Sequence, residues 1–488
     1  MVIESLKYKI LQQFGFAPTQ EQGQALDTFV SFLTDRDPQA VMILRGSAGT
    51  GKTSLSGAIV RTLLQIRQKV MLLAPTGRAA KVFSLGSGAP AYTIHRRIYR
   101  EKAFAGVDGQ FSLNDNLYTD TLFMVDEASM IANMGLGGTT FGSGCLLDDL
   151  VKFVYQGHND RLLLIGDKAQ LPPVGEEESP ALSASVMGGY GLKVYECDLN
   201  EVLRQSQSSG ILYNATLIRQ MITHDAVTGL PLIRFKGFAD IVMMPGAELV
   251  ESLGDSYHHV GMDETMVITR SNKRANIYNN GIRNMVLDRE EELSSGDMLM
   301  IVKNNYFWTE KEKKESGEGS AGAVPAFLAN GDRAKVLRVS NYIELYGFRF
   351  ATLLLQLPDY DDYEMQVTGM LDTLQSEAPA LTHEQQEELF RQVEEDYQHF
   401  VPLKTDRMKS IRQDAYFNAL QIKYAYAVTC HKAQGGQWAH VYVDQGYMTD
   451  DMLTPDYIHW LYTAFTRATD KLFLVNWPKE QTCEPTDL

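Results

Sequence analysis

The sequence predicts an α/β protein with two parallel-sheet domains, the second of which is interrupted by a small β-barrel. Apolar runs alternate with helical patterns through the first 200 residues, as they do in chains that build a parallel sheet. Between about residues 296 and 420 the pattern changes to short antiparallel strands, and the alternation returns at residues 423–429 and 471–476. The 488 residues favour about two to four domains, and a hydrophobic content of 44% indicates a globular chain.

Four strands are expected in the first sheet, because each is a near-continuous apolar run of the kind that helices bury on both faces. They cover residues 41–44, 70–74, 121–125 and 161–165. Between residues 100 and 120 the pattern changes to short extended pieces around a turn at residues 106–109, which predicts an inserted hairpin. The glycine-rich stretch 135–144 is expected to be a mobile loop.

Alternation resumes after residue 212, with a strand at residues 265–269 and a helix at residues 273–287. The strands of the barrel are expected at residues 298–302, 332–339, 342–345 and 348–357. Because the α/β pattern returns only after these strands, the barrel is expected to be an insertion within the second α/β domain.

The insertion has two further features. The charged run at residues 310–320 is expected to be a disordered loop. An acidic amphipathic helix is expected farther along, because Leu389, Val393 and Tyr397 recur at helical spacing. The barrel is therefore expected to carry a helical extension.

One short segment has the pattern of a phosphate-binding loop. Residues 46–53 read GSAGTGKT, a G-x-x-x-x-G-K-T pattern between an apolar strand and a helix. In such a loop backbone N–H groups surround the phosphates, Lys52 adds a positive charge, and the Thr53 hydroxyl is placed to ligate Mg²⁺. The nucleotide-binding residues predicted here are Gly46, Ser47, Ala48, Gly49, Thr50, Gly51, Lys52 and Thr53. The expected cofactors are ATP and Mg²⁺, and the alternative is a glycine turn that binds no nucleotide.

Two adjacent carboxylates follow the strand at residues 121–125. Asp126 can hold the magnesium through its water shell, and Glu127 can orient and deprotonate the attacking water. Gln170, beyond the next strand, can reach the terminal phosphate and sense its loss. The predicted metal residues are therefore Thr53 and Asp126, although a surface acidic pair at a strand end remains the alternative for the carboxylates.

Composition limits the class of protein. The formal charge of −16 argues against holding duplex nucleic acid by bulk electrostatics, but much of the acid lies at residues 359–364 and 384–396, so a basic groove elsewhere stays open. The four cysteines are scattered and form no C-x-x-C spacing, which argues against zinc, iron–sulfur and structural disulfides. No run of eighteen apolar residues and no signal-peptide pattern occurs, so we expect a cytoplasmic protein without a membrane partner.

The chain resembles the superfamily 1 helicases, and specifically the 1B branch that includes RecD-like, Dda-like and Pif-like DNA helicases. Beside the phosphate loop and the carboxylate pair, the matching motifs, in the family's order, are TQEQ at 19–22, APTGRAA at 74–80, TIHR at 93–96, LRQ at 203–205, TCHKAQGG at 429–436 and YTAFTRA at 462–468. The resemblance covers nearly the whole chain. It implies two RecA-like motor domains, with the first comprising residues 1–99 and 121–205 and the second residues 206–295 and 421–488. It also implies an inserted hairpin at residues 100–120 and an inserted barrel with its helical extension at residues 296–420.

The resemblance also implies roles for individual residues. Gln22 would contact adenine, Gly435 would join DNA to nucleotide, and Arg204 and Arg467 would each reach the γ-phosphate. The catalytic residues implied are Lys52, Asp126, Glu127, Gln170, Arg204 and Arg467. Arginines that touch ATP across a cleft would make closure of that cleft depend on the γ-phosphate.

Nucleic-acid contacts are expected at loops that follow strands. The candidates are Thr76, Arg78, His95, Phe104, Phe111, Asn272, Arg274, Thr429, His431 and Lys432. The hairpin lies where 1B helicases carry one that splits the duplex, so Phe104 or Phe111 would stack on the last base pair. The alternative for both rings is packing against their own domain, and the alternative for His95 and His431 is a structural role.

These features predict a monomeric ATP-dependent translocase and helicase on DNA, with single-stranded DNA and DNA forks as partners. A direction of 5′ to 3′ follows from the resemblance alone. Two alternatives remain, an RNA-directed member of the same superfamily and a phosphate-loop ATPase that acts as a switch on a protein partner.

Overall fold

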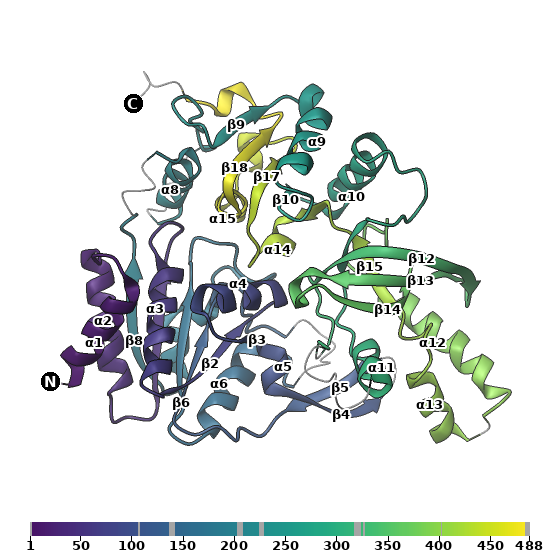
Figure 1. Cartoon of the computed structure of the whole chain (residues 1–488), viewed down its shortest axis with the longest axis horizontal. Coiled ribbons are helices and arrows are strands. Elements are labelled where there is room, and N and C mark those ends of the chain that lie inside the picture. Colours follow the sequence, from purple (N-terminus) through teal and green to yellow (C-terminus); the bar gives the residue numbers. More distant parts are fainter. Residues whose placement is uncertain are drawn as a thin grey trace. The chain divides into compact units, whose positions relative to one another are not determined.

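The computed structural model describes residues 2–483 apart from 106–107, 136–141, 203–207, 224–228, 317–323, 326 and 402 (Figure 1). The chain divides into two compact units. The first contains residues 1–243, 433–439 and 447–488, and the second contains residues 244–432 and 440–446. The expected fold class is confirmed, with parallel RecA-like sheets, an inserted hairpin and an inserted barrel that carries helices.

The first sheet is parallel, and its six strands have the order β3-β2-β6-β7-β1-β8. The strands are β1 (Ala40–Gly46), β2 (Lys69–Ala74), β3 (Ala91–Thr93), β6 (Thr121–Val125), β7 (Arg161–Gly166) and β8 (Lys193–Leu199). The four expected strands are confirmed. Every residue of β1, β6 and β7 is buried, as strands covered on both faces require.

Alternate residues of these strands enter two different cores, because successive side chains of a strand point to opposite faces. Met42 and Leu44 join one cluster with α1 (Val2–Phe14), α2 (Gln20–Leu33) and α3 (Lys52–Gln65), which Figure 1 shows together at one side of the sheet. Val41 and Ile43 join the other cluster. Its helices are α5 (Ile94–Ile98), α6 (Leu146–Gln156) and α7 (Ala184–Gly189). The remaining helices of this unit are α4 (Gly77–Ser87), α8 (Gly210–Thr223) and α15 (Pro455–Phe465).

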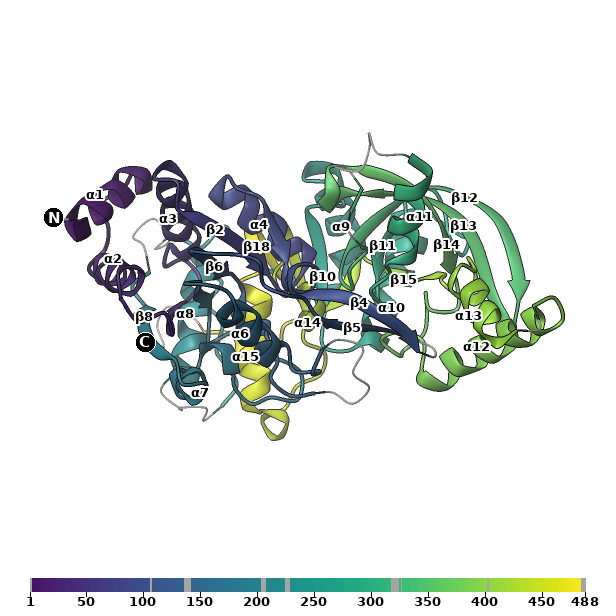
Figure 2. The same ribbon diagram turned by 90° about the horizontal axis from the view of Figure 1, so that it is seen from below.

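The expected hairpin is confirmed. Strands β4 (Tyr99–Ala105) and β5 (Asp108–Leu113) pair antiparallel, with Tyr99 opposite Leu113, and the hairpin extends away from the first sheet in Figure 2. The middle of the turn lies outside the described residues, as does most of the glycine-rich stretch that was expected to be mobile.

A second sheet has the strand order β16-β10-β17-β18-β9. Its strands are β9 (Ile241–Met244), β10 (Thr265–Thr269), β16 (Ala427–Thr429), β17 (Trp438–Asp444) and β18 (Ala468–Val475). The strand expected at residues 265–269 is confirmed and pairs in parallel with β16 and β17. The helix expected after it is α10 (Asn272–Gly281), which continues as a π-helical segment, η5 (Ile282–Val286). The helix α9 (Leu249–His259) precedes β10, and the short α14 (Cys430–Ala433) follows β16.

The barrel is closed and has five strands. They are β11 (Met298–Ile301), β12 (Arg333–Leu345), β13 (Phe348–Leu357), β14 (Tyr363–Met370) and β15 (Leu420–Tyr424). The two strands expected at residues 332–339 and 342–345 form one strand, because β12 continues through a register shift between Ser340 and Ile343. Strand β14 was not expected, and residues 423–424, which were expected to resume the α/β pattern, belong to the barrel strand β15.

The helical extension carries one correction. Residues expected to begin a disordered loop form the helix α11 (Phe307–Ser316), while residues 317–320 lie outside the described part. The helix is anchored at its start, where the buried Trp308 donates from Nε1 to the Asn418 carbonyl oxygen at 2.9 Å. The charged residues of this segment led to the prediction of a disordered loop, whereas the segment forms a short helix whose first turn is buried.

The expected acidic helix is confirmed as α12 (His383–Gln398), and α13 (Lys404–Arg412) follows it beside the barrel (Figure 1). Thr382 and Gln385 form a capping box at the start of α12. Leu389 and Val393 are buried in a core cluster with Phe350 of the barrel. In the described part of the chain, no helix has both the length and the apolar character needed to cross a membrane.

Candidate active site

The phosphate-binding loop connects the end of β1 to the start of α3. Gly49 and Gly51 have φ angles of 77° and 80°, in the left-handed region that favours glycine. A Cβ atom at Gly46 would lie 2.9 Å from both Lys52 Cγ and Thr50 Oγ1, closer than real contacts allow. All three positions therefore require glycine in this loop conformation.

The donors of this loop fit the phosphates of ATP. Helix α3 begins at Lys52, so the N–H groups of its first turn have no acceptor within the helix. Lys52 Nζ donates to the carbonyl oxygen of Gly46 and, at 3.0 Å, to that of Ser47. Neutral carbonyls are weaker acceptors than phosphate oxygens, so a triphosphate would be the preferred partner of this ammonium group.

The predicted metal residue Asp126 and the predicted base Glu127 directly follow β6. Asp126 Oδ1 accepts from the Glu127 backbone N–H at 2.9 Å. Burial, together with the neighbouring Glu127 carboxylate, raises the pKa of Asp126 to about 7, and a divalent cation beside it would lower that pKa again. Glu127 has a φ angle of 52°, which is uncommon for a residue with a side chain and costs about 1–3 kcal/mol. Strain of this kind is concentrated at functional sites.

Gln170 connects Glu127 to Arg467. With its amide nitrogen toward Glu127 and its oxygen toward Arg467, the distances to Glu127 Oε2 and Arg467 Nη2 are 3.2 and 3.3 Å. Arg467 is only 3% exposed, and it also donates from Nη1 to the Gly436 carbonyl oxygen at 3.2 Å. The structure thus brings together the predicted base, the predicted sensor and one predicted arginine. The second predicted arginine, Arg204, lies outside the described residues.

Tyr462 belongs to the same site, although the sequence did not single it out. Its hydroxyl donates to Asp167 Oδ2 at 2.6 Å and accepts from the Ala48 backbone N–H of the phosphate loop at 3.0 Å. Burial raises the pKa of Tyr462 well above its usual value, so the phenol is neutral. The only sequence signal was its place in the YTAFTRA motif, where a large aromatic residue on an apolar helix is typical of a core position.

Gln22 is tied to the phosphate loop and to the start of α2. Its Nε2 donates to the Thr50 carbonyl oxygen at 2.9 Å, and its Oε1 accepts from the Thr19 N–H at 3.0 Å. The side chain is 1% exposed. Gln22 therefore supports the loop, and its contact with adenine stays a prediction.

Three predicted residues of the first unit lie close to one another. Thr76 caps α4 by accepting from the Ala79 N–H at 3.2 Å. A Cβ atom added at Gly435, whose φ angle is 73°, would lie 3.1 Å from Thr76 Oγ1. Arg78 stacks over the ring of Trp438, with its guanidinium carbon 4.5 Å from the ring centroid. A threonine hydroxyl, a glycine backbone and a stacked arginine thus gather at the start of α4.

His95, on α5, is placed where burial lowers its pKa to about 4. Its ring centroid lies 5.7 Å from that of Tyr99. The imidazole is therefore neutral near pH 7. If it contacts nucleic acid, as predicted, it does so without a positive charge.

In the second unit, Thr429 ends β16, and His431 and Lys432 lie on α14. His431 is exposed, whereas burial of Lys432 lowers its pKa to about 8. Asn272 opens α10, and Arg274 binds Asp444 Oδ2 through Nε at 2.8 Å and Nη2 at 2.6 Å. A phosphate would have to compete with this carboxylate for Arg274.

The two hairpin phenylalanines differ in what the structure describes. Phe111 is partly buried and packs against the core cluster shared by α5 and α6, as the alternative of local packing requires. Phe104 is placed on β4 opposite Gly109, and its side chain lies outside the described part. Wedge roles for both rings stay predictions.

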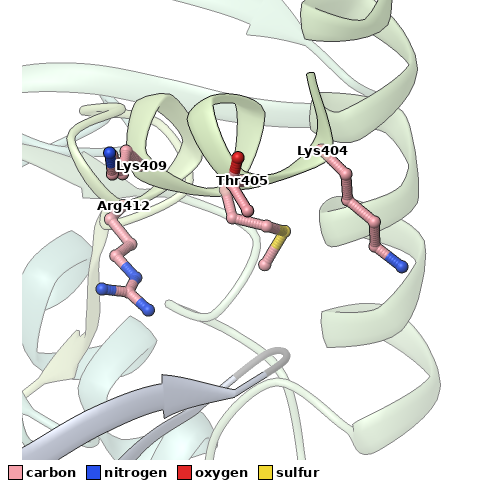
Figure 3. A pocket seen from close by; sticks show the side chains of 5 residues that line it. Lys404, Thr405, Lys409 and Arg412 are labelled. Carbon is pink, nitrogen blue, oxygen red and sulfur yellow. The ribbon is translucent and has the colours of Figure 1, made fainter. Parts of the chain in front are cut away.

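A cavity of about 420 Å³ lies apart from these residues, along α13 in the helical extension (Figure 3). It is lined by Lys404, Thr405, Met408, Lys409 and Arg412, which share one side of that helix. The predicted nucleotide and nucleic-acid residues all belong to other elements.

Comparison with known proteins identified similarity in both halves of the chain. Residues 17–229 match a family model described as an AAA domain, and residues 424–475 match the UvrD-like helicase C-terminal domain. The ATP-dependent RecD2 DNA helicase of Deinococcus radiodurans is 30% identical over 157 residues, which are 32% of this chain and 18% of that protein. The ATP-dependent DNA helicase dda of Enterobacteria phage T4 is 25% identical over 267 residues, 53% of this chain and 55% of that protein. This chain therefore spans less than two thirds of either relative.

Among solved structures, the Pif1 helicase from Bacteroides in complex with ADP-AlF3 and ssDNA matches with a TM-score of 0.46 at 13% identity. The match covers 96% of this chain and 95% of that one.

Proposed function

Because the chain belongs to the superfamily 1B helicases, we propose that it is an ATP-dependent DNA helicase that moves along single-stranded DNA from 5′ to 3′. The observation that carries this proposal is the contact of Gln170 with both Glu127 and Arg467. A neutral amide between a base and a cation can change partners when the terminal phosphate arrives or leaves. This is the property that a motor needs in order to couple hydrolysis to movement.

The proposed chemistry assigns one task to each group. The phosphate loop and Lys52 hold the triphosphate of ATP, and Thr53 and Asp126 hold Mg²⁺. The metal supplies positive charge for the phosphate oxygens. Glu127 orients the attacking water and takes its proton. Arg467 stabilises the charge that develops on the transferred phosphoryl group, with Arg204 proposed as its companion.

The proposed DNA contacts form two groups. Thr76 and Arg78 lie at the start of α4 in the first unit, and Thr429, His431 and Lys432 lie at the end of β16 and on α14 in the second. Hydroxyl groups, backbone donors and a few cations are the contacts that bind single strands without reading sequence. Such contacts let a motor advance along any strand. The proposed domain limits are those inferred from the sequence, with residues 1–99 and 121–205 as the first motor domain and residues 206–295 and 421–488 as the second, except that residues 421–424 belong to the barrel strand β15.

A tailed-duplex assay tests this function. We expect ATP-dependent unwinding of a DNA duplex with a 5′ single-stranded tail and none of the same duplex with a 3′ tail. A blunt duplex and a reaction without ATP are the controls. Unwinding from the 3′ tail alone would refute the assigned direction. ATPase stimulation by RNA but not by DNA would favour the RNA-directed alternative, and no stimulation by either would favour a switch acting on a protein.

The pKa of Lys432 predicts how DNA binding depends on pH. With a pKa of about 8, Lys432 is charged below that pH and neutral above it. DNA phosphate favours the charged form of Lys432, so above pH 8 Lys432 must be protonated when DNA binds. We expect affinity for single-stranded DNA to fall between pH 7 and pH 9, by at most about ten-fold per pH unit.

The variant Lys432→Arg is the matched control for this pH effect, because arginine stays charged throughout the range. Its affinity should depend less on pH. Lys423, whose pKa burial and the charge of Lys432 also lower to about 8, is present in both proteins. The difference between the two pH profiles therefore reports the loss of charge at Lys432 together with its effect on the neighbouring Lys423, and identical profiles would remove Lys432 from the DNA contacts.

A further inference from the structure

Arg219 is a cation beside the phosphate loop that no motif assigns. It lies on α8, and its Nη1 donates to Ser47 Oγ. Its Nη2 lies 3.5 Å from the Asn200 carbonyl oxygen, at the limit of a hydrogen bond. Arg219 is partly buried, and Ser47 is buried.

Ser47 lies between two positive charges. Lys52 Nζ donates to its carbonyl oxygen at 3.0 Å, while the Arg219 guanidinium donates to its hydroxyl group. Two cations that meet at one neutral residue repel each other, and burial strengthens the repulsion. This arrangement favours an anion at the same place.

Two buried arginines of the chain have carboxylate partners, whereas the hydrogen-bond partners described for Arg219 are neutral. Arg45 pairs with Asp198 at 2.7 Å, and Arg283 pairs with Asp297 at 3.0 Å. Within the described ranges, Arg219 forms no ion pair with a carboxylate. A partly buried guanidinium group that is held by neutral partners can still bind an anion through charge-assisted hydrogen bonds.

We propose that Arg219 binds a phosphate group of the nucleoside triphosphate held by the phosphate loop. This inference rests on the proposed function for the identity of the ligand, and it adds an arginine distinct from Arg204 and Arg467. Arginine presents several donors in a fixed fork, so one guanidinium group can contact both Ser47 and a phosphate oxygen. The contact would also place α8 under the control of the nucleotide.

Binding measurements without DNA test the proposal. The variant Arg219→Gln should weaken binding of a non-hydrolysable ATP analogue by about ten-fold or more, because it removes a charge-assisted hydrogen bond to phosphate. Arg219→Lys, which keeps the charge, should recover part of the loss. The nucleotide-induced rise in melting temperature should shrink in Arg219→Gln, while the melting temperature without nucleotide stays close to that of the wild type.

Arg234→Gln is the matched control. The guanidinium carbon of Arg234 lies 5.4 Å from the ring centroid of Tyr213, which is on α8 like Arg219, and Arg234 makes no contact with Ser47 among those described. It removes the same charge and should leave binding of the analogue unchanged. Wild-type affinity in Arg219→Gln would overturn the proposal. A loss shared equally by Arg219→Lys and accompanied by a lower melting temperature without nucleotide would also overturn it, since that pattern means that Arg219 only supports the loop. The outcome is independent of unwinding, so a wild-type protein that binds the analogue and fails to unwind DNA would refute the proposed function alone.

Discussion

Glu127→Gln should abolish ATP hydrolysis while nucleotide binding stays nearly intact. The substitution keeps the size of the side chain and removes the carboxylate that we propose as acceptor of the proton of the attacking water. General-base catalysis contributes about 10² to 10⁴ in rate, so kcat should fall by at least about a hundred-fold. Glutamine at position 127 would have to adopt the same left-handed backbone conformation as glutamate, so the substitution adds no new strain and the fold should tolerate it. Steady-state ATPase with single-stranded DNA, together with titration of an ATP analogue, measures the two effects separately.

Lys52→Ala is the companion variant for Glu127→Gln. It removes the charge that we propose contacts the phosphates in both the ground and the transition state, so it should weaken binding of the analogue and also stop turnover. The two variants should therefore differ in affinity and agree in lacking hydrolysis. A near-normal ATPase rate in Glu127→Gln would show that another group accepts the proton.

Arg467→Ala should have the second large effect, a loss of ATPase activity of about 10³- to 10⁵-fold, the usual contribution of an arginine finger. It should also flatten the difference in single-stranded DNA affinity between the ATP-analogue state and the ADP state. The physical reason is its contact with Gln170, which links this guanidinium group to Glu127 at the site of hydrolysis. Fluorescence titration of labelled DNA in each nucleotide state measures the difference.

Because Arg467 is buried and donates to the carbonyl oxygens of Thr463 and Gly436, its removal also disturbs local structure. Arg467→Lys is therefore the second variant, since it keeps the charge and loses the fork of donors. Melting temperatures of both variants identify any loss of fold. If a folded Arg467 variant retained the full nucleotide-dependent difference in DNA affinity, Arg467 would have no part in the coupling.

The elements that were predicted well are those whose signal is contiguous in the chain. Strand β6 and strand β13 have the bounds expected from their apolar patterns. Strand β14 was missed because it follows an acidic run, although its buried Met365 and Val367 alternate with Glu364 and Gln366. Helix α11 was missed because its charges resembled a disordered segment, while the contact that anchors it, between Trp308 and Asn418, spans 110 residues. Local patterns report burial on one element, and they do not report which distant residue provides it.

The same distinction applies to the candidate site. The sequence alone determined the phosphate loop, because the glycine positions, the lysine and the following helix are adjacent in the chain and the loop's conformation depends on them. Only the tertiary structure placed Gln170 between Glu127 and Arg467 and brought Arg219 to Ser47. Tyr462 reaches the loop across 414 residues of sequence. Such contacts depend on how whole elements pack, and the sequence of a motif does not identify the distant residue that each of its side chains contacts.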